Sequence, residues 1–266
     1  MSIYCRSSVA IFDGVGASSQ SSQALFDFFH TALADGIKVK KVNVDFIKNA
    51  DWEKETGLLV MGGGKCSEWE EALGERGKEK IQNFVREYGG GYLGFCAGAY
   101  YTAENRIFFQ SGSPPIKKTG LGFVQKVIGP LFPTSDPLSI HSAKALRIRM
   151  LNGENGRAYY QGGGYFVFEQ HRDVRVIANY EDKAGSLPVV ISIALGNRGG
   201  RAVVSALHPE FTWNQDVTGV DNERYRKLVK KLAPYEKFRY ALWFKILNEF
   251  NLGLPKQIFK LETPLE

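Results

Sequence analysis

The chain has 266 residues, of which 44% are hydrophobic and 23% charged, with a net charge of +6, an ordinary composition for a globular protein. The positive charge is spread along the chain, and its densest patch (224–231) lies on an expected helix. Because there is also no nucleic-acid-binding motif, we expect no nucleic-acid partner. No stretch approaches the roughly 18 apolar residues of a membrane span, so we expect no membrane contact either.

The cysteine content points to free thiols. Cys5, Cys66 and Cys96 are too few and too scattered for a disulfide framework, and they lack the spacing of a zinc site. The N-terminus has no apolar run long enough for a signal peptide. We therefore expect a reducing, cytoplasmic setting, and neither a metal nor a cofactor.

The first hundred residues alternate between expected strands and helices. The pattern predicts strands at 9–12, 37–44, 58–61 and 91–95, and helices at 18–33 (capped by Ser18 or Ser19) and 75–88. Strands that alternate with helices at this spacing are typical of a parallel sheet with crossover helices.

From about residue 104 the sequence becomes rich in strands, with Gly, Pro and Asn between them and without long helices. The expected strands are 107–110, 123–128, 145–150, 158–161, 165–169, 174–180, 189–195 and 202–207. They predict a strand-rich insertion or antiparallel extension. A helical tail follows at 222–251, broken near Pro234. No repeat or low-complexity linker divides the chain, so we expect a single domain.

Cys96 stands on a sharp turn between an expected strand and an expected helix, in the sequence GFCAGAY (94–100). Glycines on both sides suit a strained nucleophile elbow, in which flanking Cβ atoms would clash. The helix N-terminus would stabilise a thiolate there. A buried structural cysteine on a tight turn explains these residues equally well.

Of the four histidines, only His208 ends a buried strand, which is where an α/β sheet places active-site groups. Glu210 follows two residues later and, in an extended segment, points the same way. Its carboxylate could fix the imidazole tautomer. Taken alone, His208-Pro209-Glu210 is more often a surface turn.

A glycine run, Gly62-Gly63-Gly64, follows the strand at 58–61. Its backbone N–H groups, together with that of Ala97, could form an oxyanion hole. The alternative is a flexible or phosphate-cradling loop, but the run lacks the spacing of a Walker loop and the Ser or Thr after the lysine.

These three segments resemble the class I glutamine amidotransferase fold and, more closely, the biotin-protein ligase N-terminal domain family. The matching strings are LLVMGGG (58–64), YGGGYLGFCAGAYY (88–101), YYQGGGYFV (159–167), VIANYED (176–182) and SALHPEF (205–211), with Asp51-Trp52. The resemblance implies a flavodoxin-like three-layer α/β sheet over 8–213, with a strand-rich extension, and a helical C-terminal extension at 214–266.

The resemblance also implies roles for single residues. Cys96 is the expected nucleophile, His208 the general base and then acid, and Glu210 the residue that orients it. The expected oxyanion donors are Gly63, Gly64 and Ala97, and the expected substrate-binding residues are Gly62, Tyr100, Gly163, Gly164 and Tyr165. A hairpin turn is the alternative explanation of the glycines at 162–164.

Two departures from the family pattern stand out. Met61 occupies a position where the family usually has proline, so the oxyanion loop can differ in stiffness. The second departure is that the family's name promises a ligase, which we do not expect this chain to contain. Asn197–Arg201 faintly resembles the glycine–arginine loop that a biotin ligase needs, but it is better explained as a hairpin turn.

The sequence therefore favours a cysteine-dependent amidohydrolase or amidotransferase that acts on a small amide through a thioester. Ammonia transfer would require a separate acceptor or ligase subunit. A non-catalytic binding or regulatory module on the same fold is the main alternative, and a peptidase or deglycase relative is a weaker one.

Overall fold

A nine-stranded sheet organises the protein, whose computed structural model describes residues 8–33, 36–137, 139–169, 173–181, 186–213 and 222–250. Five strands run parallel, in the order β2-β1-β3-β4-β13. They are β1 (Ser8–Phe12), β2 (Lys38–Val42), β3 (Thr56–Met61), β4 (Gly91–Phe95) and β13 (Gly200–Ser205). The predicted parallel sheet is confirmed.

The other half of the sheet is antiparallel and continues from β13 in the order β12-β11-β8-β9. These strands are β8 (Lys144–Met150), β9 (Asn155–Tyr160), β11 (Val174–Tyr180) and β12 (Pro188–Leu195). The turn between β12 and β13 contains Asn197 to Gly199, with Gly199 at a φ of 77°. The segment that faintly resembles a ligase loop is thus a hairpin connection, as predicted.

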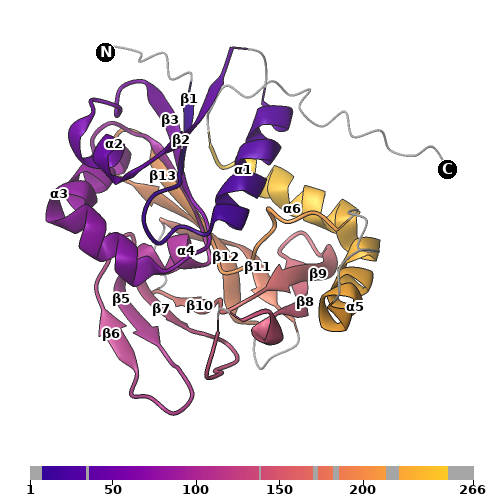
Figure 1. Ribbon diagram of the computed structural model, residues 1–266. Coiled ribbons are helices and arrows are strands. Elements are labelled where there is room, and N and C mark those ends of the chain that lie inside the picture. Colours follow the sequence, from indigo (N-terminus) through magenta and orange to yellow (C-terminus); the bar gives the residue numbers. More distant parts are fainter. Residues whose placement is uncertain are drawn as a thin grey trace.

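A second sheet of four strands takes the rest of the strand-rich region, in the order β10-β7-β5-β6. Its members are β5 (Ala103–Phe108), β6 (Ile116–Lys118), β7 (Val124–Gly129) and β10 (Tyr165–Val167). The hairpin of β5 and β6 projects from the body of the molecule (Figure 1). The expected extension therefore divides into an antiparallel half-sheet and a separate small sheet.

Helices cover both faces of the parallel strands. Figure 1 shows α1 and α6 side by side on one face, and α2 and α3 on the other. The helices are α1 (Ser19–Ala32), α2 (Val44–Asn49), α3 (Cys66–Arg86), α4 (Ala97–Tyr101), α5 (Glu223–Leu232) and α6 (Glu236–Leu247), with 3-10 turns at Ile140–Ser142 and Ala233–Tyr235. None of the helices in the described ranges is both long and apolar enough to cross a membrane.

Helix α3 starts earlier than its apolar pattern predicts, at Cys66 instead of Glu75. Gly74 has non-helical dihedrals (φ 57°, ψ −170°), so two helical segments join at a kink there. The apolar periodicity marks only the second segment. The break of the tail near Pro234 is confirmed by the 3-10 turn between α5 and α6, whereas 214–221 and 251–266 of the expected extension lie outside the described residues.

Helix α6 packs on the core through Trp243, which is fully buried. The indole stacks on Phe28 of α1 with ring centroids 4.0 Å apart and meets Phe95 of β4 at 5.2 Å. Its N–H donates to the carbonyl of Pro209 (2.8 Å), just beside the segment that carries His208 and Glu210. The C-terminal helix thus supports that segment from behind.

We expect Trp243→Ala to lower the free energy of unfolding by about 3–5 kcal/mol, because it leaves a large cavity between α1, β4 and α6. Phe244→Ala is the matched control, since Phe244 is 44% exposed on the same helix. It should change stability by only about 0.5 kcal/mol. Chemical denaturation measures both, and equal losses would contradict the packing described.

Candidate functional site

Cys96 lies on a strained turn at the carboxyl edge of the sheet, between β4 and α4. Its φ of 47° and ψ of −101° fall in a region that non-glycine residues rarely adopt. The turn is held by its N–H, which donates to the carbonyl of Ser205 (2.9 Å), and by the Gly98 N–H, which donates to Gly62 (3.1 Å). The predicted elbow geometry at Cys96 is therefore present.

Close packing explains the glycine after the cysteine. A Cβ on Gly98 would lie 2.0 Å from the carbonyl oxygen of Met61, and one on Gly94 would lie 2.7 Å from the Gly98 carbonyl. No side chain fits at either position without moving backbone. Gly94 and Gly98 are therefore required because α4 starts in direct contact with β3 and β4.

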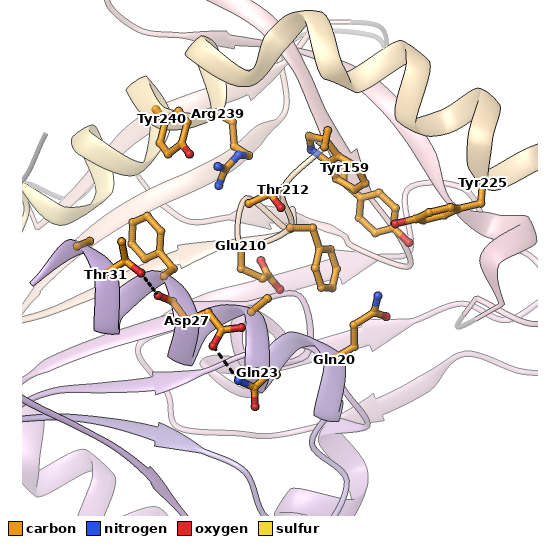
Figure 2. A pocket seen from close by; sticks show the side chains of 15 residues that line it. Gln20, Gln23, Asp27, Thr31, Tyr159, Glu210, Thr212, Tyr225, Arg239 and Tyr240 are labelled. Carbon is orange, nitrogen blue, oxygen red and sulfur yellow. Dashed lines mark hydrogen bonds between the residues drawn. The ribbon is translucent and has the colours of Figure 1, made fainter. Parts of the chain in front are cut away.

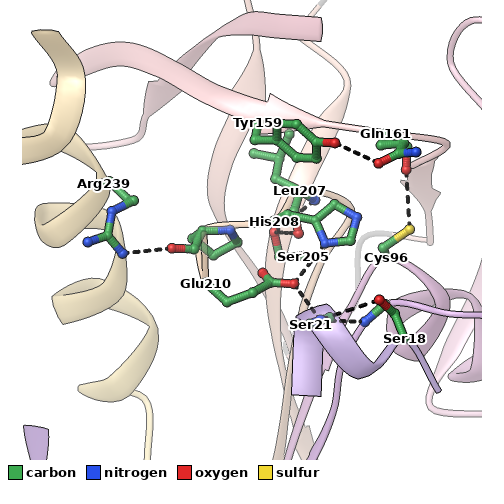
Figure 3. A network of polar contacts seen from close by, with 12 residues as sticks. Ser18, Ser21, Cys96, Tyr159, Gln161, Ser205, Leu207, His208, Glu210 and Arg239 are labelled. Carbon is green, nitrogen blue, oxygen red and sulfur yellow. Dashed lines mark hydrogen bonds and ion pairs between the residues drawn. The ribbon is translucent and has the colours of Figure 1, made fainter. Parts of the chain in front are cut away.

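His208 and Glu210 follow β13, beside the elbow (Figure 3). The imidazole Nδ1 lies 2.7 Å from Glu210 Oε1, and both side chains are buried. The His208 ring also stacks on Phe211, with centroids 5.3 Å apart. The Cys96 thiol donates to the carbonyl oxygen of Gln161 at 3.4 Å. Cys96, His208 and Glu210, predicted as a set, are therefore brought together.

The electrostatic surroundings favour a charged imidazole. Burial alone lowers the pKa of His208, but attraction to Glu210 and Cys96, with hydrogen bonds to both, outweighs it and raises that pKa well above its usual value. An imidazolium beside Cys96 stabilises a thiolate, which is the nucleophilic form of cysteine.

Ser21, on the first turn of α1, connects the glycine loop to the carboxylate and was not predicted. Its hydroxyl donates to Glu210 Oε1 (2.7 Å) and accepts from the Gly63 N–H (2.9 Å). The sequence marks this stretch only as a helix start, and Ser18 does cap the helix. No pattern in the sequence indicates that Ser21 reaches across to a residue 189 positions later.

This contact corrects the expected oxyanion hole. The Gly63 N–H already donates to Ser21, so it is engaged in this structure. Within the described ranges, the N–H groups of Gly64 and Ala97 have no backbone acceptor, and both residues line the cavity at Cys96. Of the three expected donors, Gly64 and Ala97 are thus the two whose N–H groups stay candidates.

A cavity of about 250 Å³ opens at Cys96. Its walls include Tyr100 and Phe108, the buried Arg106, and residues of the β5–β6 hairpin. Of the expected substrate-binding residues, Tyr100 lines it, and the Tyr100 hydroxyl donates to the carbonyl of Gly162, another lining residue (3.0 Å).

The other expected substrate-binding residues do not line the cavity; they are Gly62, Gly163, Gly164 and Tyr165. The Gly62 carbonyl accepts from Gly98, and a Cβ on Gly163 would lie 1.9 Å from the Ala206 carbonyl oxygen. Gly164 accepts from the Tyr180 hydroxyl (2.9 Å), and Tyr165 pairs with Ile128 in the small sheet. These residues position the wall through packing and backbone bonds.

Cys66 also lines the cavity but is held in a buried polar cluster. The Arg106 guanidinium contacts its sulfur and pairs with Glu70 through two bonds, of 2.6 and 3.0 Å. Burial raises the pKa of the Cys66 thiol well above its usual value. We therefore regard Cys66 as an unreactive wall residue.

Cys96, His208 and Glu210 are called the triad below. The other histidines of the described residues are not part of it. His30 and His141 are exposed on α1 and on a 3-10 turn, while His171 and Cys5 lie outside the described residues. The described part of the chain holds no group of three or more His, Cys, Asp or Glu side chains that could bind a metal ion.

Comparison with known proteins gives one family match and two curated relatives. Residues 7–265 match the family model described as "Biotin-protein ligase, N terminal". An uncharacterized protein of Chlamydia muridarum is 33% identical over 223 residues, which are 80% of this chain and 84% of that one. The biotin–protein ligase of Schizosaccharomyces pombe is 29% identical over 96% of this chain but only 40% of its own length.

Among solved structures, a glutamine amidotransferase superposes with a TM-score of 0.53 at 18% identity, covering 85% of this chain and 98% of its own. At this identity the likeness concerns the fold alone. It confirms the predicted amidotransferase-type α/β architecture.

We expect iodoacetamide to alkylate Cys96 much faster than Cys66 near neutral pH, because a charged His208 lies beside Cys96 whereas burial raises the pKa of the Cys66 thiol. Mass spectrometry of peptides from the folded protein measures both rates. His208→Ala should slow labelling of Cys96, with His30→Ala as the exposed control. Equal labelling of the two cysteines would exclude an activated thiol.

We expect Ser21→Ala to lower the free energy of unfolding by about 1–3 kcal/mol and to slow Cys96 alkylation severalfold, because Gly63 and Glu210 both lose a partner. Ser22→Ala is the matched control, since that buried hydroxyl donates to Asp13 (2.6 Å) instead. It should affect stability but leave the alkylation rate unchanged. The same rate in both variants would remove Ser21 from the site.

Proposed function

This chain belongs to the biotin-protein ligase N-terminal family, and from that premise we propose that it is a cysteine-dependent amidohydrolase or amidotransferase acting on a small amide. The observation that carries the proposal is Cys96, held at a positive φ beside the buried His208–Glu210 pair. A packing cysteine has no need of a strained backbone, a buried ion pair and a cavity at its sulfur.

In the proposed reaction, the Cys96 thiolate attacks the amide carbonyl, and the N–H groups of Gly64 and Ala97 stabilise the oxyanion. The C–N bond breaks while the imidazolium of His208 gives its proton to the leaving amine. A thioester is left on Cys96. Water, deprotonated by His208, or a second amine then breaks the C–S bond and restores the thiol.

The cavity sets the size of the proposed substrate. About 250 Å³ is less than the range of common drug-sized sites, so the acyl group should be small. Arg106 stands in the wall but is already paired with Glu70, so it shapes the cavity and is not a free cation for a substrate carboxylate. Glutamine and other small amides are the substrates to test.

We place the acceptor of any released ammonia on a partner, either a separate acceptor or a ligase subunit. The chain spans 40% of the length of the S. pombe ligase it resembles. An amidotransferase unit beside a ligase unit is one arrangement that would join the two activities. Cys66 and Cys96, which are free thiols in the described part of the chain, suit a reducing, cytoplasmic setting.

We expect the wild-type protein to release ammonia from glutamine or another small amide, and Cys96→Ala to reduce that rate by about 10³-fold or more. The measurement is an ammonia-coupled screen, with His30→Ala as an exposed control that keeps activity. Thioester trapping with hydroxylamine would show the intermediate. A wild-type rate equal to that of Cys96→Ala for every amide would favour the non-catalytic binding module.

A further inference from the structure

A second, larger cavity of about 540 Å³ is lined by Glu210 and Arg239 and not by Cys96. In Figure 3, Arg239 and Cys96 lie on opposite sides of Glu210. We call this cavity the α1–α6 groove, because its walls are one face of α1, the start of α6, and the segment 210–213 after β13 (Figure 2). Its volume falls within the range typical of small-molecule sites. The amide chemistry proposed above makes no use of it.

Glu210 lines this groove and presents an oxygen that the triad does not use. Oε1 accepts from Ser21 and pairs with His208, at 2.7 Å in each case. Oε2 is buried and has no hydrogen-bond donor among the described residues. A buried carboxylate oxygen without a donor is costly, and a ligand that donates a hydrogen bond would satisfy it.

The charges around the groove favour a cation. Asp27 of α1 brings a second carboxylate, which accepts a hydrogen bond from the neutral amide of Gln23 (2.8 Å). Arg239 of α6 also lines the groove, but its guanidinium is bound to Glu236 (2.6 and 2.8 Å) and to the Pro209 carbonyl (2.9 Å). The acidic groups are therefore the ones left to meet a ligand.

The remaining walls are largely aromatic. Phe28, Phe211, Trp213 and Tyr240 all line the groove, two of them on helices and two on the segment after Glu210. Aromatic faces attract organic cations and bury their apolar parts. A buried carboxylate at Glu210, an exposed one at Asp27 and the aromatic rings together form a setting suited to an amine with an apolar body.

We propose that the α1–α6 groove is a binding site for a small organic amine, whose ammonium group donates to Glu210 Oε2 and faces Asp27. The same contact reaches the triad, because Glu210 holds His208 through its other oxygen. An ammonium on Oε2 competes for the negative charge that stabilises the imidazolium. The bound amine therefore weakens the support for a charged imidazole beside Cys96 and slows the reactions of its sulfur.

Binding is tested with benzylamine against benzyl alcohol, its neutral counterpart, by calorimetry and by the fluorescence of Trp213 at constant ionic strength. We expect benzylamine to bind with a dissociation constant of about 1 mM, and benzyl alcohol at least about fivefold more weakly. Equal affinities, or no binding of either at tens of millimolar, would overturn the proposal.

A pair of matched variants locates the site. Asp27→Asn should weaken benzylamine binding by about two- to fivefold, the effect of an exposed ion pair. Asp45→Asn is the control, because Asp45 is also exposed on a helix and accepts from an amide four residues away, that of Asn49. Equal affinities in the two variants would place the amine elsewhere.

Coupling to the triad is tested by the alkylation of Cys96. Saturating benzylamine should slow it by about threefold, and Asp27→Asn should need more benzylamine for the same effect. Binding without any slowing would overturn the contact with Glu210. The binding measurements do not require an active nucleophile, so they decide on the groove even if no amide is a substrate.

Discussion

The close approach of α4 to β3 is the constraint on which the site depends. The Gly98 N–H donates to the Gly62 carbonyl, and a Cβ on Gly98 would clash with the Met61 carbonyl oxygen. At the start of this closely packed helix, Cys96 has a positive φ. That backbone conformation turns the sulfur toward the end of β13, where His208 and Glu210 follow. Without it, the thiol would continue the direction of β4 and the three side chains would not meet.

A second layer of contacts fixes the partners of the thiol. Ser21 joins the glycine loop to Glu210, Trp243 holds the Pro209 carbonyl from behind, and Phe211 stacks on the imidazole. These contacts come from α1, from α6 and from the segment after β13. The helices on one face of the sheet therefore act as the support of the ion pair as well as its cover against solvent.

The grouping of Cys96, His208 and Glu210 was predictable because each of them follows a strand, and parallel strands bring their carboxyl ends to one edge. The glycines on both sides of Cys96 also predicted the sharp turn between its strand and its helix. The sequence could not reveal Ser21, since a serine in a helix's first turn is explained by capping alone. The sequence also suggested that Gly163 and Gly164 bind substrate, whereas they pack on the backbone of Ala206 and Ile128. In a sequence, a glycine that packs on backbone looks the same as one that faces a ligand.

The cavity at Cys96 receives much of its wall from the small sheet and its projecting hairpin, whereas the triad belongs to the large sheet. The residues proposed for the chemistry and those that shape the cavity therefore lie on different stretches of chain. The hairpin between β5 and β6 can change length or sequence without disturbing the strained turn or the ion pair. Under the function proposed above, exchange of that hairpin is a route by which new selectivity could arise or be engineered while Cys96, His208 and Glu210 stay unchanged.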